Sequence, residues 1–258
     1  MIVSRPPWHT PPSSTTVQEL SVMSSELPKS TGAPARQNVT FPSAGGTAHG
    51  YLALPPSGSG PGVIVIQEWW GLTDHIANVA DRLAQEGFVA FAPDLYGGNV
   101  AHESDEALRM MRALPVARGV ELLSGAVDHL LSLPEVTSDT VGAVGFCMGG
   151  GFVLYLAAAD PRVSAAVPFY GVIQGEFPDF SGLKAQILGH YGELDESIPA
   201  KSLDALRETV ERQSGITADL RLYPANHAFF NDGRPVYDAD SAARAWASTV
   251  PFLHARLG

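Results

Sequence analysis

Two kinds of hydrophobic pattern alternate along most of the chain. Continuous apolar runs, typical of strands buried on both faces of a sheet, predict strands at residues 62–67 and 88–92. Further strands are predicted at residues 140–145, 165–169, 185–190 and 219–223. Apolar residues spaced three or four apart predict helices at residues 74–85, 103–113, 116–133, 149–159, 200–213 and 239–256. The last of these helices contains Pro251, which predicts a kink.

A hairpin is predicted before this alternation begins, with strands at 38–42 and 49–54 and a turn at 43–46. Strands that alternate with helices indicate an α/β protein with a mainly parallel sheet covered on both faces. Ligands of such sheets bind beyond the carboxyl ends of the strands. Chemistry is therefore expected in the loops that follow residues 67, 92, 145, 190 and 223.

Residues 1–36 have a different composition from the rest, with many prolines, serines and threonines. Such a segment buries too little apolar surface to offset its chain entropy. We expect an N-terminal extension at 1–36, with a short helix at 17–25, and a single domain at 37–258.

The composition of the chain excludes several classes of protein. With 45% hydrophobic residues in 258, the chain can form a sizeable core. Its net charge of −11 argues against nucleic-acid or anionic-membrane partners, which require a basic surface. The longest aliphatic run is residues 63–66, too short for a membrane span, and the first thirty residues lack a signal-peptide pattern. A cytoplasmic protein is expected, and its single cysteine forms no internal disulfide.

That cysteine lies in a motif typical of catalytic nucleophiles. The sequence Gly145-Phe146-Cys147-Met148-Gly149-Gly150 joins a predicted strand to a predicted helix, as in the Gly-x-nucleophile-x-Gly elbow. Small neighbours are needed because the sharp turn leaves no room for side chains. A helix N-terminus also favours a thiolate. The alternative is a Cys147 that packs as a small buried hydrophobic residue.

An elbow nucleophile requires an acid and then a histidine later in the chain. His227 follows the last predicted strand, whereas His190 lies within an apolar run and is expected to pack in the core. Asp195, in the loop after residues 185–190, is the candidate acid, with helix capping as its alternative role and Glu193 in reserve. His227 would accept the thiol proton, and Asp195 would orient its ring.

Together these motifs resemble the dienelactone hydrolase family of α/β hydrolases. The resemblance covers about residues 38–257 and rests most specifically on the Cys147 elbow and the Gln67-Glu68 pair after the first buried strand. Further matching segments are residues 67–71, 92–97, 169–171, 192–195 and 223–232. The resemblance implies an α/β-hydrolase fold and an esterase that acts on small esters or lactones, without a cofactor, through a Cys–His–Asp triad.

The resemblance also implies further roles. Glu68 would lie near the thiol and keep it protonated until substrate binds, because a nearby carboxylate disfavours a second negative charge. Backbone N–H groups of Trp69 and Met148 would form the oxyanion hole. Separately from the resemblance, aromatic residues that fall in or near the expected site loops are expected to bind substrate, namely Trp70, Tyr96, Tyr170 and Phe229, with Phe230 beside them.

Two positions depart from the family pattern. Family members hold a substrate carboxylate with arginines where this chain has Gly98 and Asn231. Without that clamp, small neutral esters are expected to be better substrates than dienelactone-like carboxylates. Arg234 is close enough in sequence to substitute, but the sequence does not place it.

Other functions remain open from the sequence. A thioesterase or acyltransferase could use the same scaffold, and a binding protein with a decayed site is a further alternative. A glutamine-amidotransferase-like enzyme shares the cysteine elbow but lacks the acid-then-histidine order of Asp195 and His227. A metal site is not expected, because the chain has one cysteine and no His-x-x-x-His pair.

Overall fold

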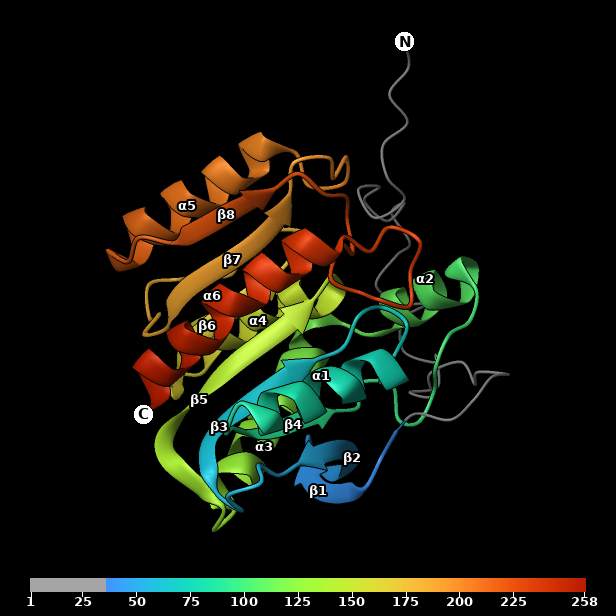
Figure 1. Cartoon of the computed structure of the whole chain (residues 1–258), viewed down its shortest axis with the longest axis vertical. Coiled ribbons are helices and arrows are strands. Elements are labelled where there is room, and N and C mark those ends of the chain that lie inside the picture. Colours follow the sequence, from blue (N-terminus) through green and yellow to red (C-terminus); the bar gives the residue numbers. More distant parts are fainter. Residues whose placement is uncertain (1–35) are drawn as a thin grey trace, which may run out of the picture.

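The computed structural model describes residues 36–258, whose strands form one sheet of eight (Figure 1). The strands are β1 (Val39–Ser43), β2 (Gly46–Ala53), β3 (Gly60–Ile66), β4 (Val89–Pro93), β5 (Val136–Phe146), β6 (Val163–Phe169), β7 (Gln186–Gly192) and β8 (Asp219–Tyr223). Their order in the sheet is β1-β2-β4-β3-β5-β6-β7-β8. β2 pairs antiparallel with both β1 and β4, and all other neighbours are parallel.

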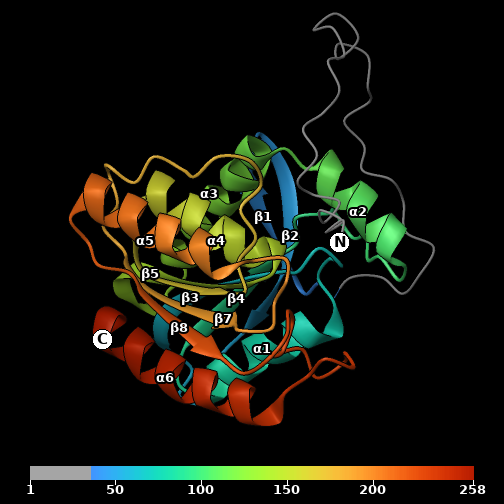
Figure 2. The same cartoon turned by 90° about the horizontal axis from the view of Figure 1, so that it is seen from above.

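Helices cover both faces of this sheet. They are α1 (Asp74–Gln85), α2 (Ser104–Ala113), α3 (Val116–Ser132), α4 (Met148–Ala159), α5 (Ala200–Ser214) and α6 (Ala239–Leu257). Figure 2 shows α1 and α6 on one face and α3, α4 and α5 on the other. The mainly parallel α/β architecture expected from the alternation of patterns is confirmed.

The apolar runs form the central strands of the sheet, which helices cover on both faces. All four residues from Val63 to Ile66 in β3 are fully buried, because α1 and α6 cover one face of the strand and α3 and α4 the other. Burial of each such side chain contributes roughly 1.5–3 kcal/mol. The central strands therefore form a rigid base for the loops at their carboxyl ends.

Each strand and helix predicted within residues 36–258 is present, and the differences lie at the ends. β5 begins at Val136, four residues before the predicted strand. The sequence did not indicate this first half of the strand, because its positions alternate between partly buried and exposed and contain no apolar run. The hairpin turn is only two residues long: Ala44 and Gly45 both have positive φ, and Ser43 pairs with Gly46. Pro251 lies inside the continuous helix α6. The predicted helix at 17–25 lies outside the described residues.

His190 has the core position expected of it. It is fully buried in β7, where its Nδ1 atom lies 2.9 Å from the Tyr223 hydroxyl and its Nε2 atom 3.0 Å from Thr249 Oγ1. Burial, together with the charge of Arg221, lowers its pKa to about 3, so the ring is neutral at pH 7. His190 thus links β7, β8 and α6 and does not reach the candidate site.

No helix among residues 36–258 combines the length and the hydrophobicity that crossing a lipid bilayer requires.

Candidate active site

Cys147 lies at the sharp turn between β5 and α4, with φ 54° and ψ −116°. This conformation is strained for a residue other than glycine and is held by backbone hydrogen bonds. The Cys147 N–H donates to Phe169 O at 3.0 Å, and its carbonyl accepts from Val172 N at 3.0 Å and Gly151 N at 3.2 Å. The partly buried thiol is consequently presented at the carboxyl edge of the sheet.

Two glycines of the motif make this turn possible. A Cβ atom at Gly145 would collide with the carbonyl oxygen of Gly149, and one at Gly149 would collide with the carbonyls of Ile66 and Gln67. In both cases the obstacle is backbone, which has little freedom to move away. The steric reason inferred from the motif therefore agrees with the packing around the turn.

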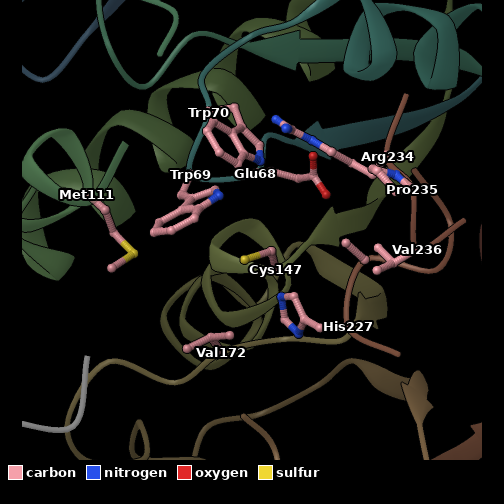
Figure 3. A pocket seen from close by; sticks show the side chains of 11 residues that line it. Glu68, Trp69, Trp70, Met111, Cys147, Val172, His227, Arg234, Pro235 and Val236 are labelled. Carbon is pink, nitrogen blue, oxygen red and sulfur yellow. The ribbon is translucent and has the colours of Figure 1, made fainter. Parts of the chain in front are cut away.

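The loops after β7 and β8 bring Asp195 and His227 together at this edge. His227 Nδ1 lies 2.6 Å from Asp195 Oδ2, and the ring lies beside the Cys147 side chain (Figure 3). The Asp195 side chain is almost fully buried, at 2% exposure, whereas that of His227 is 25% exposed. Three side chains from three loops thus form one connected line of polar contacts.

Charges and hydrogen bonds among these residues shift the pKa values of His227 and Asp195. Burial favours a neutral His227 ring, but the interaction with Cys147 and the hydrogen bond and charge of Asp195 outweigh it and raise the pKa of His227 to about 10. Burial also favours a neutral Asp195, but its contacts with His227 and Ser197 hold its pKa below the ordinary value. The arrangement therefore favours a charged imidazolium held against the Asp195 carboxylate.

Ser197 is a member of this cluster that the sequence reasoning missed. Its backbone N–H donates to Asp195 Oδ1 at 2.9 Å, and its hydroxyl donates to the same oxygen. The hydroxyl also lies 3.3 Å from His227 Nδ1. An Asp followed two residues later by Ser is typical of an Asx turn, so this signal was present in the sequence.

Glu68 follows β3 and is 1% exposed. Its Oε2 atom accepts a hydrogen bond of 2.6 Å from Asn231 Nδ2. Asn231, which the sequence reasoning treated only as a missing arginine, is also buried, and its Oδ1 atom accepts from Gly233 N at 3.0 Å. A neutral amide therefore fixes both the Glu68 carboxylate and the loop that follows His227.

The thiol, the imidazole and the Glu68 side chain open into one cavity of about 220 Å³. Figure 3 shows Cys147 near its centre, with His227 beside the sulfur and Glu68 on the opposite side. The lining residues are Glu68, Trp69, Trp70, Met111, Cys147, Val172, His227, Ala228, Arg234, Pro235 and Val236. Among the described residues, no three His, Cys, Asp or Glu side chains are placed to hold a metal ion.

Of the two residues expected to supply oxyanion N–H groups, one lines this cavity and the other adjoins Cys147 in the chain. Trp69 belongs to the loop after β3 and lines the cavity, and Met148 is the first residue of α4, directly after Cys147. Trp70 also lines the cavity, as the prediction of a substrate-binding role requires.

Three other aromatic residues predicted to bind substrate do not line the cavity. Tyr96 is fully buried, with its hydroxyl 3.2 Å from Met148 Sδ. Tyr170, at φ 38°, directs its ring into the core 5.0 Å from the His227 ring, and Phe229 packs 5.4 Å from the Tyr170 ring. Their position in site loops was predicted correctly, but their side chains point inward and support the residues that form the cavity wall.

The structure places Arg234, which the sequence could not. Its guanidinium carbon lies 3.8 Å from the centroid of the Trp70 ring, and both side chains form the cavity wall (Figure 3). A cation stacked on an aromatic face remains able to donate hydrogen bonds from its edge. The cavity wall therefore carries a guanidinium, the substitution for the missing arginines that the sequence left open for Arg234.

Comparisons with known proteins identify the relatives of this chain. Residues 48–257 match the model of the Dienelactone hydrolase family. Protein usf of Aquifex pyrophilus is 38% identical over 226 residues, covering 84% of this chain and 97% of that protein. The "Putative carboxymethylenebutenolidase" of Aquifex aeolicus is 34% identical, covering 86% and 99%. The crystal structure of the "Putative Dienelactone Hydrolase" of Klebsiella pneumoniae superimposes with a TM-score of 0.76 at 30% identity, covering 85% and 97%.

Proposed function

The chain belongs to the dienelactone hydrolase family and has its α/β-hydrolase fold, and from this premise we propose that it hydrolyses small esters or lactones through a thioester formed on Cys147. The observation that carries the proposal is the line of contacts from Asp195 through His227 to Cys147, which ends at a cavity of about 220 Å³. A cavity of this volume suits a small substrate.

Acylation begins when the Cys147 sulfur attacks the carbonyl carbon of the ester. As substrate binds, the thiol proton passes to His227, whose pKa of about 10 favours the charged ring. The carbonyl oxygen becomes an oxyanion, which accepts hydrogen bonds from the N–H groups of Met148 and Trp69. When the tetrahedral intermediate collapses, the C–O bond breaks, His227 gives its proton to the departing alkoxide, and the acyl group remains as a thioester.

Hydrolysis of the thioester reverses these roles. His227, now neutral, takes a proton from a water molecule that attacks the thioester carbonyl. The second tetrahedral intermediate releases the acid and returns the sulfur as a thiolate, which takes its proton back from the His227 imidazolium. Throughout both halves, Asp195 holds the Nδ1–H side of the ring, so that Nε2 faces the sulfur and the substrate.

Glu68 is proposed to keep the Cys147 thiol protonated until substrate binds, because its carboxylate lines the same cavity as Cys147. Glu68→Gln removes the negative charge while leaving a carbonyl oxygen for Asn231 Nδ2. We expect iodoacetamide to alkylate Cys147 in the free variant several-fold faster than in the wild type at pH 7, since less repulsion opposes the thiolate. The rate is followed by intact-protein mass spectrometry.

The matched control for this experiment is Glu193→Gln, which neutralises an exposed carboxylate of the acid loop outside the cavity. Its alkylation rate should equal that of the wild type. If Glu68→Gln is alkylated at the wild-type rate or more slowly, Glu68 does not keep the Cys147 thiol protonated.

Arg234 changes the expected response to substrate charge. Its guanidinium on the cavity wall can pair with a carboxylate of the substrate, so Arg234→Gln is expected to lower kcat/KM for a carboxylate-bearing ester by about tenfold. The rate for a neutral ester of the same shape should change by less than about twofold, because Gln retains much of the packing on Trp70. Initial rates on the two esters, measured side by side, give both values.

Arg118→Gln is the control, because Arg118 contacts Ala44 O and Glu121 on the surface. An equal loss for charged and neutral esters in Arg234→Gln would show that Arg234 only shapes the cavity.

A further inference from the structure

Ser197 and His227 share the hydrogen bonds to the Asp195 carboxylate. The Asp195 side chain is 2% exposed, so its charge depends on donors from the protein and not on bulk water. Among the described residues, His227 Nδ1 lies 2.6 Å from Oδ2. Oδ1 accepts from the backbone N–H of Ser197 at 2.9 Å and from the Ser197 hydroxyl. Each oxygen of the carboxylate therefore has its own partner.

This division of partners determines the orientation of the carboxylate. The terminal torsion of an aspartate side chain has a broad energy minimum, so the group rotates easily unless hydrogen bonds hold it. Two donors from Ser197 hold Oδ1, which leaves Oδ2 directed at the His227 ring. Ser197 thus selects the oxygen that meets the imidazole and the angle at which it does so.

The same hydroxyl also lies next to the His227 ring. Its oxygen is 3.3 Å from His227 Nδ1. Because the hydroxyl donates its proton to Asp195 Oδ1, its lone pairs remain available to the Nδ1–H group. The side chain of Ser197 therefore contacts both partners of the hydrogen bond between Asp195 and His227, whereas its backbone N–H donates to the carboxylate.

The Ser197 hydroxyl supports the negative charge of Asp195 as well. Burial alone would raise the pKa of this carboxyl group, but its hydrogen bonds with His227 and Ser197 hold the pKa below the ordinary value. An ionised carboxylate at this position stabilises the imidazolium that forms during each half of the proposed reaction. Orientation and charge of Asp195 thus depend on the same serine.

We propose that Ser197 is a positioning residue of the hydrolytic site, whose hydroxyl holds the Asp195 carboxylate in the orientation that keeps the His227 ring directed at Cys147. The inference rests on the proposed function and adds a residue to its machinery. It requires the hydroxyl and not merely the volume of the side chain. A threonine at position 197 should therefore replace the serine, whereas a valine, which has the shape of threonine without the hydroxyl, should not.

The first test compares Ser197→Thr with Ser197→Val in the hydrolysis of a small neutral ester. Ser197→Val should lower kcat by about tenfold, because both halves of the reaction use the histidine that Asp195 orients. KM should change by less than about twofold, since Ser197 is not among the residues that line the catalytic cavity. Ser197→Thr should keep kcat within about threefold of the wild type. Ser197→Ala adds no volume and should repeat the valine result, so it decides the question if the valine variant does not fold.

Proton NMR gives a second readout that does not depend on turnover. The proton between His227 Nδ1 and Asp195 Oδ2 should give a far-downfield resonance in the wild type and in Ser197→Thr, because this contact is short and charge-assisted. In Ser197→Val and Ser197→Ala the resonance should broaden or move upfield, since the carboxylate no longer keeps one orientation.

Ser164→Val is the matched control for both measurements. Ser164 is a partly buried serine whose Oγ atom lies 2.8 Å from Thr140 Oγ1. It belongs to β6 and is near the amino end of that strand, opposite the edge that carries the site. Removal of this hydroxyl should leave kcat within about twofold of the wild type and the downfield resonance unchanged.

The outcomes separate this inference from the proposed function. Wild-type kcat in Ser197→Val and Ser197→Ala overturns the positioning role, as does an equal loss in Ser197→Thr and Ser197→Val, which would assign the effect to volume. A change in KM alone overturns it too. The proposed function stands in these cases if kcat still depends on Cys147 and Asp195. Turnover that survives Cys147→Ala contradicts the proposed function itself.

Discussion

Replacing Cys147 by alanine is expected to lower kcat/KM for a small neutral ester by at least about three orders of magnitude, since members of a catalytic triad act as a unit. The fold should persist, because alanine keeps the Cβ atom and removes only the sulfur from a partly open position. Initial rates and the thermal unfolding midpoint of the same preparation test both parts of this prediction.

Cys147→Ser is the matched variant, because it keeps a nucleophilic atom next to His227 and Asp195. A hydroxyl ionises far less readily than a thiol, so only a trace of activity is expected to remain. Turnover by the alanine variant at the wild-type rate would mean that the nucleophile lies elsewhere.

Asp195→Asn should lower kcat by about three to four orders of magnitude, with little change in the fold. An asparagine can present its amide N–H to His227 Nδ1, which selects the wrong tautomer and removes the charge that supports the imidazolium. Part of the attraction that raises the pKa of His227 to about 10 is then lost, so the ring should release its proton at lower pH than in the wild type. Kinetics and NMR titration of the ring measure the two effects.

Asp219→Asn provides the control for this substitution, because Asp219 is a surface residue of β8 paired with Arg221. Its kcat should stay within about twofold of the wild-type value. If Asp195→Asn keeps a near wild-type kcat and an unchanged His227 titration, His227 depends on a partner other than Asp195.

The sequence was sufficient to predict the order of the elements, because apolar runs and helical spacing alternate clearly and each has one structural interpretation. It was also sufficient to place Cys147, Asp195 and His227 at one edge of the sheet, since each follows a strand and parallel strands end together. The elbow glycines add a steric requirement that few other turns share. These predictions depend on chain order and backbone geometry, which local sequence largely determines.

Side-chain direction within the loops was less predictable. Tyr170 turns into the core because its backbone has positive φ, and no pattern around it signals that conformation. The sequence showed Asn231 only as a position where family members have an arginine. In the structure, its side chain hydrogen-bonds Glu68, which lies 163 positions earlier in the chain. Arg234 reaches Trp70 only because the turns after His227 direct it back across the cavity. Such contacts depend on three-dimensional packing between loops that are distant in sequence.

The most direct test of the account is to identify the acylated residue during turnover. The enzyme is mixed with an activated ester of a small acid, quenched in acid within the first turnover, digested and analysed by mass spectrometry. We expect the acyl mass on the peptide that contains Cys147, removable by neutral hydroxylamine as a thioester is. An acyl group on any other residue, or a complete burst of product with Cys147 unmodified, would contradict the proposed mechanism.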